Sequence, residues 1–140
     1  MNDIARLLPH AGDSILIERV VGWDAEHIRV ATTLHRSADN PLRRHGHLAA
    51  VNVVEFAAQA MALHGGLRGE VGRPPRAALL VSVRDLVLRR EYLEKLEGEL
   101  EIVAHALMID PQSWQYGFTV LHSGSEIASG RIAAMAQAGD

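Results

Sequence analysis

The sequence predicts an α+β fold in which an antiparallel sheet wraps around one long helix. A run of small apolar residues, 48–64, has the length and composition of a buried helix and stops at Gly65-Gly66. Two segments before this run and four after it are rich in β-branched residues and are separated by turn residues, which is the pattern of strands. No repeat, low-complexity tract or linker interrupts the 140 residues, so we expect a single domain over 1–140.

The first elements can be assigned in order along the chain. Residues 3–8 are predicted to form one helical turn. Residues 15–35 indicate a hairpin, with two partly alternating runs that meet at Asp24-Ala25. Residues 36–46 are polar and contain Pro41 and Gly46, which indicates a loop. The helix 48–64 would be about 25 Å long at about 1.5 Å per residue, enough to cross a small sheet.

The second half of the chain is predicted to be all strand. Residues 76–88, 96–109, 114–123 and 125–137 are the expected strands, and a tight turn around Ser123-Gly124 joins the last two. The helix is apolar on nearly every side, so one face of a flat sheet is too small a cover for it. We therefore expect the sheet to curl around the helix and a second copy of the chain to cover the remainder.

Composition excludes several classes of protein. The chain contains no cysteine, which excludes disulfides, thiolate metal sites and a cysteine nucleophile and is compatible with a reducing cytosol. The first ten residues lack the basic head and apolar run of a signal peptide. The longest apolar stretch is too short and too polar to span a bilayer. We expect a soluble, cytoplasmic protein.

The net charge of −3 is unevenly distributed. Residues 36–90 carry nine Arg against four acids, whereas residues 91–140 carry two basic residues against eight acids. This is either a solvated surface whose charges offset one another or a basic patch that docks an acidic partner or a phosphorylated carrier. Nucleic acid is disfavoured, because the total charge is acidic and only six aromatic residues are available for stacking. The candidate docking residues are Arg73, Arg76, Arg89 and Arg90.

Four segments resemble one family along essentially the whole chain. They are LLPHAGDSILIERVVGWD, VVEFAAQAMA, VSVRDLVLRR and SGSEIASGRIAAM. Together they resemble the 3-hydroxyacyl-acyl-carrier-protein dehydratases of the hot-dog fold. The resemblance implies a hot-dog fold, an acyl carrier protein or acyl-CoA thioester as substrate, and a homodimer or a dimer with a related hot-dog subunit.

One departure from this family concerns its catalytic histidine. The family carries it in a Gly-His-Phe-Pro segment fourteen residues before the helical Glu, and that position here is Pro41. A shorter, divergent branch of predicted dehydratases, associated with aryl-polyene-type lipid pathways, also has a weakened segment and resembles this sequence more closely. The resemblance implies acyl-thioester chemistry and leaves open whether this chain performs it.

The helix supplies candidates for dehydrating a 3-hydroxyacyl thioester. The reaction needs a base for the C2 proton, an acid for the departing C3 hydroxyl and a group that holds charge on the thioester oxygen. Glu55 suits the acid, because apolar surroundings would desolvate its carboxyl and favour the neutral, proton-donating form. Gln59 and Asn52 lie on the same helix face and would position the carboxyl and the substrate. Alternatively, these three polar residues form a seam satisfied across a dimer interface. The amides of Ala49 and Ala50 at the helix start would hold the thioester oxygen.

The candidate bases are His47 and, second, His45, which lie in the loop before the helix. Histidine titrates near neutrality, as base catalysis requires. His47 is too far from Glu55 to touch it along one helix, but the resembled family pairs these positions across protomers. Both histidines could instead cap the helix or face solvent. A His-x-His pair with no cysteine and no nearby acidic pair falls short of a coordination set, so we expect no metal site and no cofactor.

Three functions follow from these observations. The first is a dehydratase of fatty-acid or polyene-type lipid synthesis that uses Glu55 as acid and a loop His as base. The second is a hot-dog acyl thioesterase, which also places a carboxylate on the central helix. The third is a non-catalytic subunit that pairs with an active dehydratase. The sequence leaves open the acyl chain length and the choice between carrier protein and coenzyme A.

Overall fold

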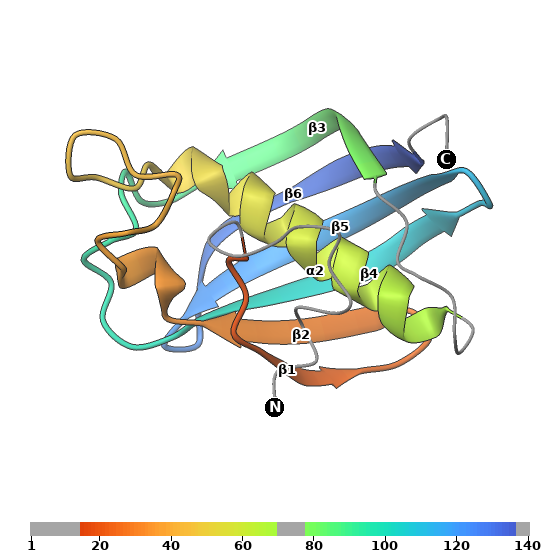
Figure 1. Cartoon of the computed structure of the whole chain (residues 1–140), viewed down its shortest axis with the longest axis horizontal. Coiled ribbons are helices and arrows are strands. Elements are labelled where there is room, and N and C mark those ends of the chain that lie inside the picture. Colours follow the sequence, from red (N-terminus) through yellow and green to blue (C-terminus); the bar gives the residue numbers. More distant parts are fainter. Residues whose placement is uncertain (1–14, 70–77, 137–140) are drawn as a thin grey trace.

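The computed structural model describes residues 15–69 and 78–136. Six antiparallel strands form one sheet in the order β1-β2-β4-β5-β6-β3, and helix α2 lies across one face of it (Figure 1). The predicted α+β arrangement of one sheet and one long helix is confirmed, whereas the predicted turn at 3–8 lies outside the described residues. The elements are β1 (Arg19–Trp23), β2 (His27–Thr32), η2 (Leu34–Arg36), η3 (Ala50–Asn52), α2 (Val53–Arg68), β3 (Ala78–Leu88), β4 (Leu100–Ile109), β5 (Ser113–His122) and β6 (Ser125–Ala136).

Alternation along the strands separates the two faces of the sheet. In β4, Leu100, Ile102 and Ala104 are buried beneath the helix, while the residues between them face outward. Strands β2 and β5 pair with β4 in a register that places their own apolar residues on the same inner face. The largest completely buried side chains of this core are Tyr116, Phe56, Phe118, Ile17, Ile28, Leu48, Leu63, Leu93, Leu100, Ile102, Ile127 and Ile132.

Both ends of the helix differ from the prediction. The α-helix begins at Val53, five residues later than expected, because Ala49 forms an antiparallel bridge with Tyr92 and a 3₁₀ turn follows. It continues through Gly65 and Gly66 to Arg68, so the predicted stop at the glycine pair is wrong. Two glycines cost about 1 kcal/mol each in a helix interior, but Leu67 packs against the core beyond them, and this burial favours the last turn.

The two predicted turns are present. Asp24 Oδ1 accepts hydrogen bonds from the backbone N–H groups of Glu26 and His27, both 2.8 Å long, which closes the β1–β2 hairpin. Ser123 and Gly124 have φ values of 52° and 81°, as a two-residue hairpin turn requires.

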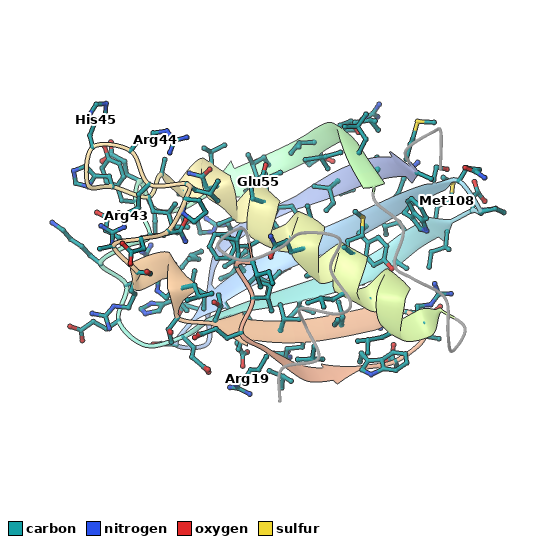
Figure 2. All side chains as sticks on the ribbon, in the orientation of Figure 1. Arg19, Arg43, Arg44, His45, Glu55 and Met108 are labelled. Carbon is teal, nitrogen blue, oxygen red and sulfur yellow. The ribbon has the colours of Figure 1, made fainter. Side chains whose placement is uncertain are left out.

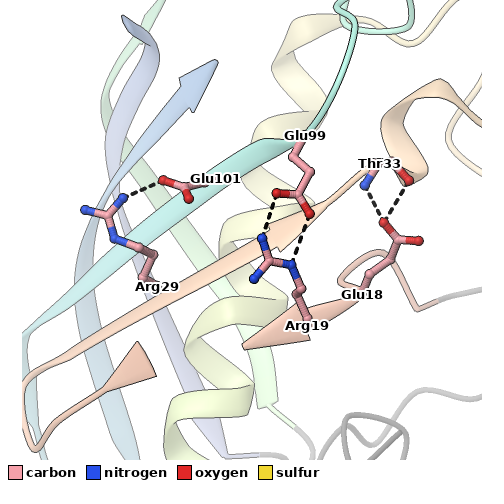
Figure 3. Close-up of polar contacts among 6 residues, drawn as sticks. All are labelled: Glu18, Arg19, Arg29, Thr33, Glu99 and Glu101. Carbon is pink, nitrogen blue, oxygen red and sulfur yellow. Dashed lines mark hydrogen bonds and ion pairs between the residues drawn. The ribbon is translucent and has the colours of Figure 1, made fainter. Parts of the chain in front are cut away.

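Ion pairs connect the outer side of the sheet near β1. Arg19 makes a two-pronged contact with Glu99, with nitrogen–oxygen distances of 3.0 and 2.7 Å, and Arg29 pairs with Glu101 across β2 and β4 (Figure 3). Glu18 Oε1 accepts hydrogen bonds from the backbone N–H and hydroxyl of Thr33 (Figure 3). These exposed pairs join neighbouring strands but are screened by solvent, so we do not expect them to dominate stability.

A sealed polar contact joins the C-terminal half of α2 to the sheet. His64 is completely buried, its Nε2–H donates to the carbonyl of Asp24 at 2.7 Å, and its Nδ1 accepts from the hydroxyl of Tyr116 at 2.5 Å. Burial lowers the pKa of His64, and burial raises the pKa of Tyr116 to about 12. Burial therefore favours the neutral form of this imidazole.

One edge of the sheet exposes apolar side chains. Among the strands that the structure describes, β3 pairs with β6 alone and lies at the edge of the sheet. The exposed apolar residues on this edge are Leu79, Val81, Val83, Val87 and Leu88. Within the described residues, no helix is both long and apolar enough to cross a membrane.

Candidate active site

The loop before α2 brings His47 against a buried carboxylate that the sequence analysis did not identify. The ring nitrogen Nδ1 of His47 lies 2.7 Å from Oε2 of Glu94, and Oε1 of the same carboxylate accepts the backbone N–H of Leu48 at 2.8 Å. The Glu94 side chain is 6% exposed, whereas the His47 side chain is 44% exposed. The imidazole therefore has one nitrogen anchored inside the protein and an edge that reaches solvent.

Backbone pairing explains why these two residues meet. Ala49 and Tyr92 form an antiparallel bridge, in which the N–H of Ala50 donates to the carbonyl of Glu91 at 2.9 Å and the N–H of Leu93 donates to the carbonyl of Leu48 at 2.8 Å. The Tyr92 ring stacks on the His47 ring with centroids 4.4 Å apart. Contacts separated by more than forty residues leave no periodic signal in a single sequence, so Glu94 and Tyr92 could not be predicted.

The carboxylate of Glu94 is held in its charged form. Burial by itself would raise the pKa of Glu94, but hydrogen bonds from the Leu48 N–H and the His47 ring outweigh that cost and lower the pKa to about 2. An ionised carboxylate accepts hydrogen bonds and donates none. The Nδ1 of His47 is therefore the donor in this pair.

The start of the helix only partly matches the predicted anion-binding site. The Ala50 N–H is occupied by the Glu91 carbonyl, so it is not available for a thioester oxygen. Among the described residues, the Ala49 N–H has no hydrogen-bond partner. Asn52 is half-buried and its side-chain amide donates to the carbonyl of Ala49 at 3.0 Å, so it braces the turn.

Glu55 is exposed, which corrects the expectation that the helix buries it. It lies in the first turn of α2, on the stripe that the sheet leaves uncovered (Figure 2). A carboxylate in the first turn interacts favourably with the helix dipole. The same stripe continues through the half-buried Ala58 and Ala62.

Gln59 is buried, unlike its neighbour one turn earlier. Its Oε1 accepts the backbone N–H of Leu16 at 2.7 Å, which ties the segment before β1 to the helix. The hydroxyl of Thr32 donates to the Leu16 carbonyl at 2.6 Å on the other side of the same residue. The amide oxygen of Gln59 is thus used within the chain, which differs both from the predicted substrate contact and from the alternative of a seam across a dimer interface.

His45 lies at the outer end of the loop. It has a positive φ of 55° in the turn between the bridged residues Arg44 and His47, and its side chain points away from α2 (Figure 2). Arg43 and Arg44 hold the loop by donating to backbone carbonyls, including those of Gly46 and Pro41. The structure therefore separates the two candidate bases, with only His47 anchored to a carboxylate.

The basic docking candidates are split between the described and undescribed parts of the chain. Arg73 and Arg76 lie outside the described residues. Arg89 and Arg90 are exposed directly after β3, three and two residues before Tyr92. Within residues 15–69 and 78–136, no group of three or more His, Asp or Glu side chains is arranged to hold a metal ion.

Comparisons with solved structures identify the fold. A chain of "The Dehydratase Heterocomplex ApeI:P" from Xenorhabdus doucetiae superposes with a TM-score of 0.87 at 21% identity, covering 98% of this chain and 91% of that chain. A thioesterase from Haemophilus influenzae superposes with a TM-score of 0.60 at 14% identity, covering 86% of this chain and 78% of that chain. The PaaI protein from E. coli has a TM-score of 0.60 at 16% identity, with 83% and 80% coverage. The predicted hot-dog fold is confirmed.

Comparison with protein families is more specific. A search of curated protein sequences gives no significant match. A model of the ApeP-like family, described as ApeP dehydratase, matches residues 2–139 and so includes the loop, the helix and all six strands. The predicted resemblance to a divergent dehydratase branch is therefore confirmed, and this chain belongs to the ApeP-like dehydratase family.

Proposed function

We propose that this protein removes water from a 3-hydroxyacyl thioester to give an enoyl thioester in polyene-type lipid synthesis. His47 takes the C2 proton through Nε2, and the electron pair of that C–H bond forms the new double bond as the C3–oxygen bond breaks. The protonated carboxyl of Glu55 gives its proton to the departing hydroxyl, which leaves as water. A return of the proton from His47 to Glu55 through solvent restores both groups.

The observation that carries this proposal is the anchored, half-exposed imidazole of His47 at the start of α2. Its Nδ1 is held by Glu94 and 44% of its side chain is exposed, so we infer that its other nitrogen is the one offered to substrate. The family's histidine position is occupied by Pro41, and His47 is the residue near it with a geometry suited to base catalysis. We assign the base to His47 and not to His45.

We infer that a second hot-dog subunit completes the site. Glu55 is exposed in the single chain, and a carboxyl acts as an acid near neutral pH only if it is removed from water. The stripe of α2 that the sheet leaves uncovered and the exposed apolar residues of β3 both favour binding of a partner. The similar chain from Xenorhabdus doucetiae belongs to a dehydratase heterocomplex, which supports a related hot-dog subunit as the partner here.

The proposed interface at the edge of β3 can be tested by placing a charged side chain on that strand. Val81→Lys should dissociate the dimer, whether it is a homodimer or a mixed one, because a lysine on an edge strand opposes strand pairing. Val21→Lys is the matched control, since Val21 is similarly exposed on β1 at the opposite edge. Sedimentation of the chain alone and with the related subunit measures both. A dimer that survives Val81→Lys and dissociates with Val21→Lys would assign the interface to the other edge.

We propose an acyl carrier protein as the donor of the substrate and Arg89 and Arg90 as its docking residues. The two guanidinium groups flank the strand end that leads to Tyr92 and His47, and carrier proteins of acidic surface would bind there by charge complementarity. Charge reversal of both should weaken carrier binding, and Arg84→Glu, on the outer face of the same strand, should not. If the double charge-reversal variant and Arg84→Glu bind the carrier with equal affinity, Arg89 and Arg90 are not the docking residues. A cytoplasmic location remains a prediction, with which the absence of cysteine is compatible.

The reaction is tested by product analysis. The wild-type chain, alone and with a related hot-dog subunit, is incubated with a 3-hydroxyacyl carrier protein, and the acyl product is identified by mass spectrometry. An enoyl product that disappears with His47→Asn supports the proposal. A free acid would indicate the thioesterase, and an enoyl product unaffected by His47→Asn in the complex would indicate a non-catalytic partner subunit.

A further inference from the structure

We propose that Glu94 is a positioning residue that holds His47 in the Nδ1–H tautomer, so that Nε2 carries the lone pair offered to substrate. This inference rests on the proposed function for its catalytic meaning, but the tautomer itself is a property of the free protein. Glu94 touches no reacting atom and acts only through the imidazole.

Both carboxylate oxygens of Glu94 are occupied by donors from one short segment. Oε1 accepts from the Leu48 N–H at 2.8 Å, and Oε2 accepts from His47 Nδ1 at 2.7 Å. Because the Leu48 contact is a backbone contact, it fixes the rotation of the carboxylate and hence the direction in which Oε2 points. The second oxygen is therefore aimed at His47 by the fold.

The ring of His47 is also fixed in its plane. Tyr92 stacks on it with an interplanar angle of 24° and a centroid separation of 4.4 Å. The bridge between Ala49 and Tyr92 connects the two backbone segments that carry these side chains. A half-turn of the imidazole about its Cβ–Cγ bond would put the carbon Cδ2 in the place of Nδ1 and lose the hydrogen bond to Glu94, and the stacked Tyr92 opposes intermediate ring angles.

A purely structural role for Glu94 predicts a different outcome from a positioning role. If Glu94 served only to cap the Leu48 N–H, an amide in its place would preserve the function, since the oxygen of Gln also accepts that hydrogen bond. A positioning carboxylate behaves differently. In Glu94→Gln the oxygen stays on Leu48 and the NH₂ group faces Nδ1, which then must accept, so the proton moves to Nε2. The exposed nitrogen loses its lone pair without a change in fold.

The test combines a nuclear magnetic resonance measurement with kinetics. The ring nitrogen shifts of His47 are measured in the wild-type chain and in Glu94→Gln at about pH 8.5, above the usual titration range of histidine. We expect an Nδ1–H tautomer in the wild type and an Nε2–H tautomer in the variant. In the active complex, kcat should fall by up to about 10⁴-fold with little change in KM, as exchange of carboxylate for amide does in other His–carboxylate pairs. Glu97→Gln removes an exposed charge from the same connecting segment and should change neither.

The outcomes separate this inference from the proposed function. A wild-type Nε2–H tautomer would overturn it, and this measurement needs no variant to fold. A folded Glu94→Gln protein that keeps the Nδ1–H tautomer, or that keeps full kcat in a complex that depends on His47, would also overturn it. The expected tautomers in a protein that dehydrates no 3-hydroxyacyl thioester would support the positioning contact and reject the proposed function alone.

Discussion

Helix α2 has a histidine near each end, and the two rings are used in different ways. At the C-terminal end, His64 is completely buried and both of its nitrogens are engaged, one with a carbonyl and one with Tyr116. At the N-terminal end, the His47 side chain is 44% exposed and one nitrogen is engaged with Glu94. A polar group whose hydrogen bonds are all satisfied inside the core contributes to stability, whereas one held on a single side is positioned and still reactive.

The polar partners differ in the same way. Tyr116 is a neutral donor whose pKa burial raises to about 12, so the contact with His64 is an uncharged one. Glu94 is a charged acceptor, and its contact with His47 stabilises an imidazolium once the ring takes a proton. The polar contacts at the C-terminal end of the helix therefore anchor it to the sheet, whereas those at the N-terminal end hold the residue that we propose as the base.

The largest expected effect separates the two histidines of the loop. In the active complex, His47→Asn should reduce kcat on the order of 10²–10⁴-fold, because a general base is lost. His45→Asn should leave kcat unchanged, and asparagine tolerates the positive φ at that position. Steady-state rates with a 3-hydroxyacyl carrier substrate measure both. An equal loss for the two variants would show that the loop as a whole, and not the anchored ring, is required.

The next effect concerns the acid on the uncovered stripe of the helix. Glu55→Gln should reduce kcat by about 10²-fold or more, since the amide donates no proton to the departing hydroxyl. Glu91→Gln, another exposed acid at the same end of the molecule, is the control for loss of charge. If both variants lower the rate equally, the carboxyl of Glu55 acts through charge alone and not as an acid.

At the other end of the helix the expected effect is on stability and not on rate. His64→Leu keeps a similar volume but leaves the Tyr116 hydroxyl and the Asp24 carbonyl without their partner, which should cost about 2–4 kcal/mol of unfolding free energy. Tyr116→Phe removes one hydroxyl and should cost about 1–2 kcal/mol. Urea denaturation at one protein concentration measures both, and kcat per folded molecule should be unchanged. A large loss of rate with normal stability would contradict the division between the two ends.

The smallest effect is on the pH dependence of stability, in two separate windows. Burial lowers the pKa values of His64 and His35, so the unfolded chain binds protons before the folded one as the pH falls below about 6.5. Their contribution is complete above that pH and declines below it, so the unfolding free energy should fall between about pH 7 and pH 5. Glu94 has a pKa of about 2 against an ordinary value of 4.5, so its contribution declines only below about pH 4.5. His64→Leu should reduce the pH dependence of the unfolding free energy in the first window, and Glu94→Gln should reduce it in the second. Urea titrations in which both variants keep the wild-type pH profile would contradict this assignment.

Local patterns were sufficient for most of the fold. The hairpin around Asp24, the six strands and the turn at Ser123-Gly124 follow from alternation and turn residues, which act over a few neighbouring positions. The ends of the helix were wrong because each depends on contacts with distant segments. Tyr92 delays its start and the burial of Leu67 extends it past two glycines.

In the candidate site, too, local features could be predicted and contacts between distant segments could not. The sequence by itself offered His47, in the loop before the helix, and Glu55, inside the helix, as candidate groups, because residue type and helical spacing are local properties. Only the tertiary structure decided that Glu55 faces outward, that Gln59 faces inward toward Leu16, and that Glu94 holds the ring of His47. Burial and hydrogen bonding are determined by segments far apart in the chain, and a single sequence does not record which of them meet.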